Sequence, residues 1–292
     1  MMPYSLILRL TMSLLIMSAL STSAFAGEVA YTNAMGIRYN PLLLGDELRI
    51  GYREKLWNKP SDDLLFGTAH LWGGAHLVLS PAFVSTGLFF AAQPIAVLEL
   101  DGGLARVLSF MTLGDILDSD LNTRGTKDAA AAAGSAVTDG WSGHFQGRLQ
   151  AKHGAFAART TALFRWFDLE GPENGLFYQQ GMDVVTGLES WVLQEDSDLL
   201  YLSPPGHWVL GLRYSYLHAF SSGTADIHRA GPLFLWKLSN PDPSPAYKDP
   251  AIVVLCQWHI AHQWRAGQSM PQSLPYLLVA YTFKGELTKS QR

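Results

Sequence analysis

The sequence predicts an all-β protein, and three observations lead to that prediction. Apolar and polar residues alternate with a period of two over long segments, a pattern that an α-helix cannot produce. Aromatic residues make up 12% of the chain and there are 27 glycines, which suits many strands joined by tight turns. Several alternating segments reach roughly eleven residues or more, whereas strands of soluble proteins average about five or six.

Composition and charge exclude several other classes of protein. Charged residues make up 16% of the 292 residues, too few for a disordered chain or a coiled coil. The formal net charge of −4 gives no electrostatic reason to expect nucleic acid as a partner. Cys256 is the only cysteine, which excludes an internal disulfide and a multi-cysteine metal site. No motif indicates a cofactor.

The first 26 residues have the pattern of a cleaved secretory signal peptide. Arg9 is their only charged residue, an apolar stretch over 10–20 follows it, and Ala24-Phe25-Ala26 supplies the cleavage site. The stretch is too short to cross about 30 Å of hydrocarbon, which argues against a transmembrane anchor. We expect cleavage near Ala26 and one domain over 27–292, since no linker or repeat interrupts that range.

The strongest alternation lies in the middle of the chain. Between 141 and 153, Trp141 and Phe145 share one face, while His144 and Arg148 share the other. Weaker alternation extends on both sides, and counts of ten or fourteen strands also fit it. Our prediction is twelve strands, at 46–57, 64–79, 82–92, 95–110, 140–152, 155–167, 175–183, 184–195, 206–220, 226–238, 251–265 and 274–284.

These strands favour a closed antiparallel transmembrane β-barrel over a soluble sandwich. Periodicity alone does not separate the two, because either fold has one apolar face. Membrane-spanning strands need about 9–11 residues, and an exported sheet in lipid must close because its backbone groups have no other partners. Aromatic residues at the expected strand ends, such as Trp57, Trp141, Trp166, Trp191 and Trp264, fit the interfacial girdles of such barrels.

The last predicted strand resembles the closing strand of Gram-negative outer-membrane β-barrel proteins. In 275–283 the alternate residues Leu277, Val279, Tyr281 and Phe283 share one face, and the segment ends on an aromatic residue. The resemblance implies an outer-membrane location, surrounding lipid and lipopolysaccharide, and contact with the outer-membrane assembly machinery. The tail 284–292 departs from the family, whose aromatic residue usually ends the chain.

A looser resemblance concerns two turn-containing segments. Leu79-Ser80-Pro81-Ala82-Phe83 and the run 93–100 are similar to a group of uncharacterised outer-membrane proteins of myxobacteria and their relatives. This resemblance implies architecture and location, and no activity.

The face predicted to line the lumen is basic, and two interpretations remain open. In one, its arginines attract anions through a water-filled pore, so that glutamate at 148 and 159 would cut or reverse anion preference. In the other, they pair with acids such as Glu99, Asp183 and Glu189 and fill a barrel too narrow to conduct. The candidate lumen residues are Arg49, Arg53, Arg148, Arg159, Arg165 and Arg213.

Catalytic and metal sites are not predicted. His259 and His262 are three residues apart on an expected strand and therefore point to opposite faces. The run Asp118-x-Asp120-x-Asn122 lacks the glycine and glutamate of a calcium loop, so we expect a solvated acidic loop. Ser215 and His218 have unequal parity, which keeps a serine–histidine pair from converging.

Three hypotheses for function follow. The first is an integral barrel of the outer membrane of a Gram-negative bacterium with a structural or transport role, in its transport form a narrow channel for small anionic or polar solutes. The second is an outer-membrane barrel enzyme that acts on envelope lipid. The third is a soluble periplasmic β-barrel that binds a hydrophobic ligand.

Overall fold

Fourteen strands account for the regular structure of the described residues. The computed structural model describes residues 27–57, 63, 65–110, 138–171, 175–204, 206–221, 226–239, 244–263, 265 and 275–287. Within these ranges, no helix is long and apolar enough to span a bilayer. The strands are β1 (Glu28–Tyr39), β2 (Leu43–Lys55), β3 (His70–Leu79), β4 (Phe83–Ile95), β5 (Leu98–Ser109), β6 (Thr138–His153), β7 (Phe156–Glu170), β8 (Leu176–Gln179), β9 (Val184–Gly187), β10 (Glu189–Leu202), β11 (Trp208–Ala219), β12 (Ile227–Lys237), β13 (Lys248–Ala261) and β14 (Tyr276–Glu286).

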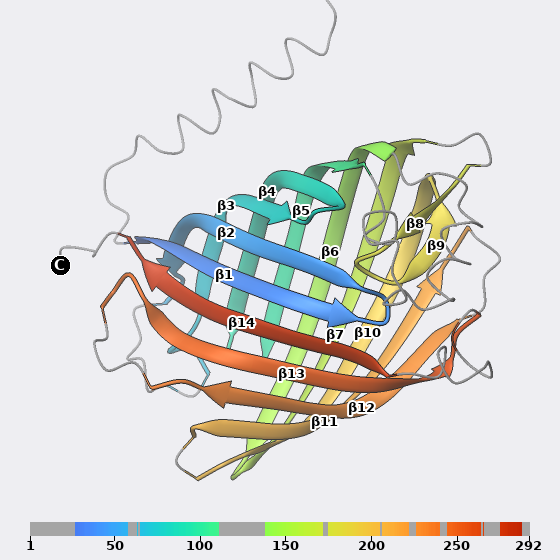
Figure 1. The fold of residues 1–292 in the computed structure, drawn as a ribbon. Coiled ribbons are helices and arrows are strands. Elements are labelled where there is room, and N and C mark those ends of the chain that lie inside the picture. The colour runs from blue at the N-terminus through green and yellow to red at the C-terminus, as the bar shows by residue number, and fades with distance from the viewer. Residues whose placement is uncertain are drawn as a thin grey trace, which may run out of the picture.

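Twelve of these strands form one closed antiparallel barrel, which confirms the predicted fold class (Figure 1). Its order is β1-β14-β13-β12-β11-β10-β7-β6-β5-β4-β3-β2, and the ring closes where β1 pairs with β14. Closure matters physically because an open sheet would leave a row of unpaired backbone groups at each edge.

The strand prediction needs correction at three places, one of which is 184–195, where it joined β9 and the start of β10 into one strand. The sequence prediction began at residue 46 and missed β1, which pairs with both β2 and β14. It also counted 175–183 as a wall strand, whereas β8 pairs only with β9 in a separate two-stranded sheet. The total of twelve is right because one strand was missed and another was added.

The two faces of the wall differ sharply in polarity. Outward positions are apolar and exposed, for example Leu212 at 62%, Leu199 at 60% and Phe90 at 56%. Cross-strand partners share a face of the sheet, so the register places Arg49 opposite His76 and Arg148 opposite Glu99 on the inner face. The outer face of the barrel is therefore apolar, and the charged residues of these strands lie on the inner face.

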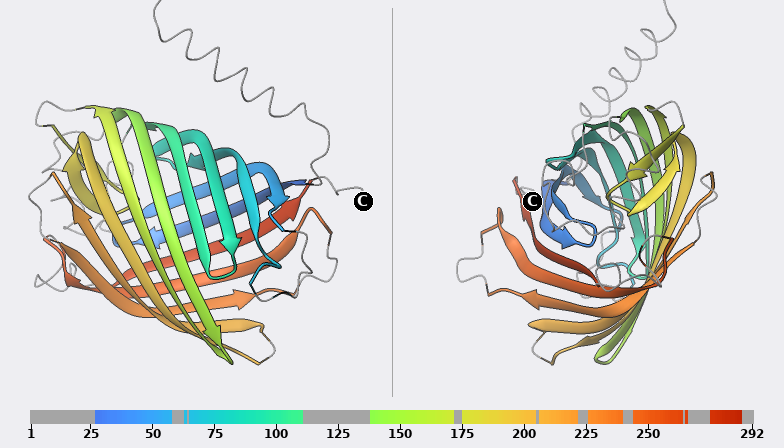
Figure 2. Two further views of the ribbon diagram at one scale, coloured as in Figure 1. Left: turned by 180° about the vertical axis from the view of Figure 1, so that it is seen from behind. Right: turned by 45° about the vertical axis from the view of Figure 1, so that its right-hand side comes forward.

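The two ends of the barrel differ in what they contain. β1 begins and β14 ends at one end, which we call the terminal rim. The β8–β9 hairpin lies inside the wall at the other end, which we call the hairpin rim (Figure 2). Side chains of the hairpin form a buried apolar cluster with inward residues of β7, β10, β11 and β12. Members of that cluster from the hairpin are Phe177, Met182 and Val184.

Some predictions fall outside the described residues. These are the signal peptide over 1–26, the acidic run Asp118-x-Asp120-x-Asn122 and Trp264.

Candidate functional site

The β8–β9 hairpin crosses the barrel lumen at the hairpin rim. Its base joins β7 to β10, and its apolar side chains pack against the inner wall there. Its tip reaches β1, which stands six strands around the ring from β7. The Arg38 guanidinium on β1 donates to the carbonyl oxygens of Gln180 and, at 2.9 Å, Gly181 in the tip. The hairpin thus contacts opposite sides of the wall and lies across the lumen, and we call it the plug.

A buried ion pair fixes the tip of this plug. Asp183 in the hairpin turn and Arg265 in the β13–β14 connection both have side chains with 0% exposure. Arg265 Nε donates to Asp183 Oδ2 at 2.8 Å and Arg265 Nη2 to Asp183 Oδ1 at 2.8 Å. Tyr178 donates its hydroxyl to the same Oδ1 at 2.7 Å, and Asn40 Oδ1 accepts from Arg265 Nη1 at 2.6 Å. The contact is a bidentate pair with every charged atom partnered.

The pair keeps both of its members charged. Burial by itself would raise the pKa of Asp183, but the positive charge of Arg265 and the hydrogen bond from His262 hold it well below its usual range. Burial and the neighbouring carboxylate raise the pKa of Tyr178, so its hydroxyl stays a donor. The ion pair between Asp183 and Arg265, which we call the lock of the plug, is thus intact at neutral pH.

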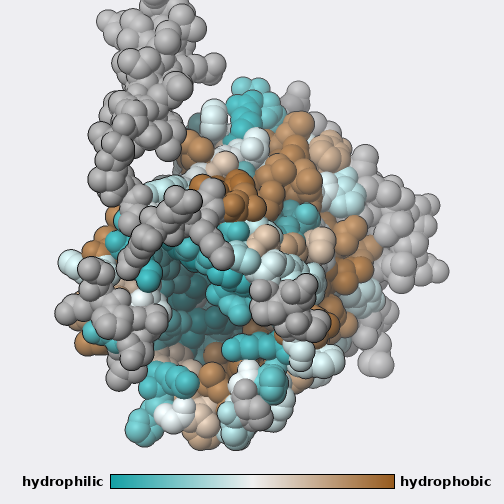
Figure 3. All heavy atoms as spheres, turned by 90° about the vertical axis from the view of Figure 1, so that its left-hand side faces the viewer, coloured by the Kyte–Doolittle hydropathy of each residue, from teal (hydrophilic) through white to brown (hydrophobic). Residues whose placement is uncertain are grey.

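Beneath the plug, three neighbouring hollows that share lining residues follow one another toward the terminal rim. A vestibule of about 780 Å³ at the terminal rim is lined by residues such as Arg53 and Lys284. It shares Lys284 with a middle hollow of about 450 Å³, which shares Arg49 and Gln146 with a chamber of about 390 Å³ below the hairpin. Figure 3 faces the terminal rim and shows a hollow lined by hydrophilic residues.

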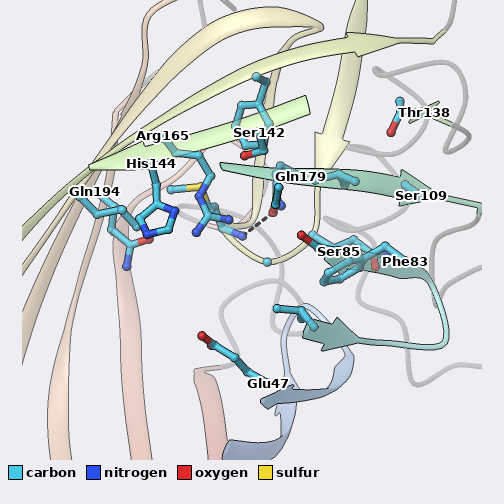
Figure 4. A pocket seen from close by; sticks show the side chains of 18 of the residues that line it. Glu47, Phe83, Ser85, Ser109, Thr138, Ser142, His144, Arg165, Gln179 and Gln194 are labelled. Atoms are coloured by element: carbon cyan, nitrogen blue, oxygen red, sulfur yellow. Dashed lines mark hydrogen bonds between the residues drawn. The ribbon is translucent and has the colours of Figure 1, made fainter. Parts of the chain in front are cut away.

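The chamber below the plug is lined by apolar side chains together with charged and polar ones. Arg165 and His144 project from neighbouring positions on β7 and β6, and Glu47 lies across the cavity from them (Figure 4). The roof is formed by hairpin residues from Phe177 to Met182. Asp101 accepts from Arg49 at 3.0 Å and contacts His144 at 2.8 Å, which orients both groups at the wall.

The register places all six candidate arginines on the inner face. Five of them lie in ion pairs: Arg49 with Glu47 and Asp101, Arg53 with Glu28 and Glu286, Arg148 with Glu99, and both Arg159 and Arg213 with Asp198. Arg165 forms no ion pair with any described residue, and its Nε is buried without a partner. Of the suggested acidic partners only Glu99 pairs with one of these arginines, because Asp183 binds Arg265 and Glu189 faces outward beside Asp168.

Other polar atoms at the chamber also lack partners in the described part of the chain. They include Nδ1 of His76 and both amide atoms of Gln180, whose side chain forms part of the roof. Buried polar groups in folded proteins nearly always find a partner. Together with Arg165 they form a surface that favours water or a polar solute over an apolar one.

Among the residues that hold the plug, sequence reasoning missed Arg38 and Arg265 and gave Asp183 the wrong arginine partners. Arg38, Asp183 and Arg265 lie far apart in the chain and meet only because the hairpin folds into the lumen. One signal was available: Gly175 and Gly187 bracket two four-residue runs that are too short to cross a membrane.

Two predictions about chemistry also meet the structure here. Ser215 lies on the inner face beside Gln257, whereas His218 pairs with Asp226 outside, so a serine–histidine pair does not form between them. The argument that separated His259 from His262 was wrong, because β13 ends at Ala261 and strand parity no longer applies to His262. The ligand atoms of Asp183, His259 and His262 all lie within 4.8 Å of one another.

The chain is similar to several solved structures. They include the NanC porin (8% identity, 88% of this chain and 100% of that chain, TM-score 0.42), the β domain of the Bordetella autotransporter BrkA (11%, 89% and 99%, 0.46) and the translocator domain of NalP from Neisseria meningitidis (11%, 96% and 95%, 0.41). No protein-family model and no curated protein matches the chain. Likeness of this degree says nothing about what the lumen binds, and the resemblance to myxobacterial proteins stays a prediction.

Proposed function

We propose that the chain is an integral outer-membrane β-barrel that admits small polar solutes, above all those bearing an anionic group, and that the β8–β9 hairpin controls their passage. One observation carries the proposal: neighbouring hollows with charged residues in their walls follow one another along the lumen, below a plug that is held by a buried ion pair. Arg165, which has no ion-pair partner among the described residues, offers the solute a cationic contact, and Glu47 offers a carboxylate across the chamber.

The outer face supports a membrane location. Trp191 pairs with Trp166 near the hairpin rim, and Tyr201, ten residues further along β10, pairs with Phe156 near the terminal rim. Ten residues span about 33 Å along a strand, which becomes about 25 Å along the axis for a tilt of about 40°. That height matches the apolar band of about 25 Å between the aromatic girdles of membrane barrels.

The polarity of the two faces favours this location over a soluble lipid-binding barrel. A soluble barrel that holds a hydrophobic ligand needs an apolar interior and a wetted exterior. Here Asp101 and Asp198 are buried with arginine partners inside, while leucines such as Leu210 and Leu212 are exposed outside. Transfer of that exterior to water would be costly in free energy.

The length of the connections suggests an orientation. The longest connections between wall strands join strand ends at the hairpin rim, from β5 to β6 and from β7 to β10, while the two-residue connections 96–97 and 154–155 join strand ends at the terminal rim. Membrane barrels have long extracellular loops and short periplasmic turns. We therefore assign the hairpin rim to the extracellular side. Lipid and lipopolysaccharide then surround the apolar band of the outer face, which we call the belt. The signal peptide is removed on export, and the outer-membrane assembly machinery inserts the barrel.

A substitution on the outer face tests the membrane location. Arginine in place of Leu212 should destabilise the barrel by about 2–4 kcal/mol when it is folded in lipid vesicles, because a charge then faces hydrocarbon. Leu287→Arg is the matched control, since Leu287 is 54% exposed but lies after β14 and outside the belt. Denaturant unfolding in vesicles measures both. Equal stability of the two variants would contradict the location.

Conductance tests the transport role. The full chain, extracted from membranes and checked for heat-modifiable gel migration, is placed in a planar bilayer. We expect rare openings in the wild type and anion preference when open. Recovery of the protein from the aqueous periplasm without detergent would reject the location, and a bilayer silent even after the plug is released would reject transport.

A further inference from the structure

We propose that Asp183, His259 and His262 form a binding site for a divalent transition-metal ion such as Zn²⁺, which fastens the tip of the plug to the barrel wall. The proposal goes beyond solute passage and does not depend on it. The three side chains come from the hairpin turn, from β13 and from the connection that follows β13. Their candidate ligand atoms all lie within 4.8 Å of one another.

The imidazole of His259 is the first reason to infer a ligand. Both of its ring nitrogens are buried, and neither has a hydrogen-bond partner among the described residues. A neutral imidazole carries one donor and one acceptor, so both capacities are unused in a polar neighbourhood. The lone pair of one nitrogen is free to bind a metal ion.

The other two residues are already arranged around a shared point. His262 Nε2 lies 3.2 Å from Asp183 Oδ2, and the two imidazole rings meet edge to face with centroids 5.1 Å apart. Two ligand atoms that bind one zinc ion at about 2.1 Å each stand roughly 3.0–3.4 Å apart. The observed separation therefore needs little change when the hydrogen bond is replaced by two metal bonds.

The donor set selects the class of metal. Two imidazoles and one carboxylate suit zinc and neighbouring transition metals, whereas calcium and magnesium require oxygen ligands throughout. Three protein ligands leave a fourth position for water. Asp183 keeps its orientation, because Oδ1 remains bound to Tyr178 and to Arg265 Nη2 while Oδ2 turns to the metal.

Nearby positive charge opposes the ion and sets the strength of the site. Arg265 already pairs with Asp183, and Arg229 stands opposite His259 on β12. The Arg229 guanidinium lies 4.6 Å from the Tyr276 ring centroid, so its charge is partly met by the ring face. We expect zinc to bind more weakly than at a structural zinc site, so that the occupancy of the site changes with the concentration of available metal.

Calorimetric titration of the folded full chain with Zn²⁺, after removal of metal with a chelator, tests the site. We expect one equivalent per chain, affinity at least tenfold weaker in His259→Ala, and no binding of Mg²⁺. His153→Ala is the matched control, because His153 is exposed at the end of β6 by the terminal rim and should leave zinc affinity unchanged. Absence of zinc binding, or equal affinity in wild type and His259→Ala, overturns the proposal.

Hydrogen exchange distinguishes zinc that fastens the plug to the wall, which we call the latch, from zinc that binds without affecting the plug. Zinc should slow exchange of the β8 and β9 amides in the wild type and in His153→Ala, but not in His259→Ala or His259→Gln. The glutamine variant keeps a polar side chain of similar size, and heat-modifiable migration shows that each variant has folded. The latch is overturned if zinc still slows exchange in both His259→Ala and His259→Gln. It is also overturned if zinc no longer slows exchange in His153→Ala. None of these readouts requires conductance.

Discussion

Asparagine in place of Asp183 should release the plug and turn a mostly closed barrel into a mostly open one. The change leaves the buried Arg265 guanidinium without its counter-charge, which costs about 3–5 kcal/mol for a buried pair. Each 1.4 kcal/mol is about a tenfold change in an equilibrium constant, so the released population should rise by roughly two orders of magnitude or more. The backbone should tolerate the change, because residue 183 has a φ of 62° and asparagine accepts that conformation.

Single-channel recording and hydrogen exchange of the β8 and β9 amides measure this release. Glu189→Gln is the control, since it removes an outward-facing carboxylate close to the hairpin without touching Arg265. Unaltered opening and exchange in Asp183→Asn would show that the apolar cluster alone holds the hairpin.

The same pair predicts how the plug responds to acid. The pKa of Asp183 is depressed in the folded protein, so the carboxylate's contribution is complete above its unfolded value of about 3.8. It is lost only as the pH falls through the depressed folded value. The wild-type plug should therefore stay shut from pH 7 to about pH 5, and early opening in that interval would contradict a lock built on this carboxylate.

The wall of the barrel was predictable because lipid-facing and lumen-facing residues differ in polarity along most strands. β1 escaped because inward Ala30, Ala34 and Gly36 are small, while Asn33 faces outward, so polarity does not alternate. Small residues are tolerated at these inward positions because the lumen is wide enough not to require larger side chains. A hydropathy pattern does not detect such positions.

The plug and its ion pair could not be predicted from the hydropathy pattern for a different reason. Periodicity identifies the faces of a strand and does not say which sheet the strand joins, so 176–187 read like part of the wall. Asp183 and Arg265 meet through the fold of a hairpin and a connection, and their burial as a pair cannot be read from spacing. The error at His262 arose from the predicted strand end at 265, four residues past the observed one.

Glutamate in place of Arg165 should shift the chamber from anion preference to cation preference. Arg49, Arg165 and Glu47 line the chamber, and Arg49 pairs with Glu47 and Asp101, whereas Arg165 has no carboxylate partner among the described residues. A unit charge about 8 Å from a passing ion changes its energy by about 0.5–2 kcal/mol for an effective dielectric constant between about 80 and 20. Reversal of the charge doubles that change and shifts the permeability ratio by roughly fivefold or more.

Reversal potentials in a salt gradient, recorded on the released Asp183→Asn background so that openings are frequent, measure the shift. Arg106→Glu makes the same change of charge on the outer face, where Arg106 lies against Trp141, and should leave selectivity unaltered. Arg148→Glu should act less than Arg165→Glu, because Arg148 already shares its charge with Glu99 in the larger middle hollow. Equal effects at 148 and 165 would mean that the total charge of the lumen, and not the unpaired cation below the plug, selects the solute.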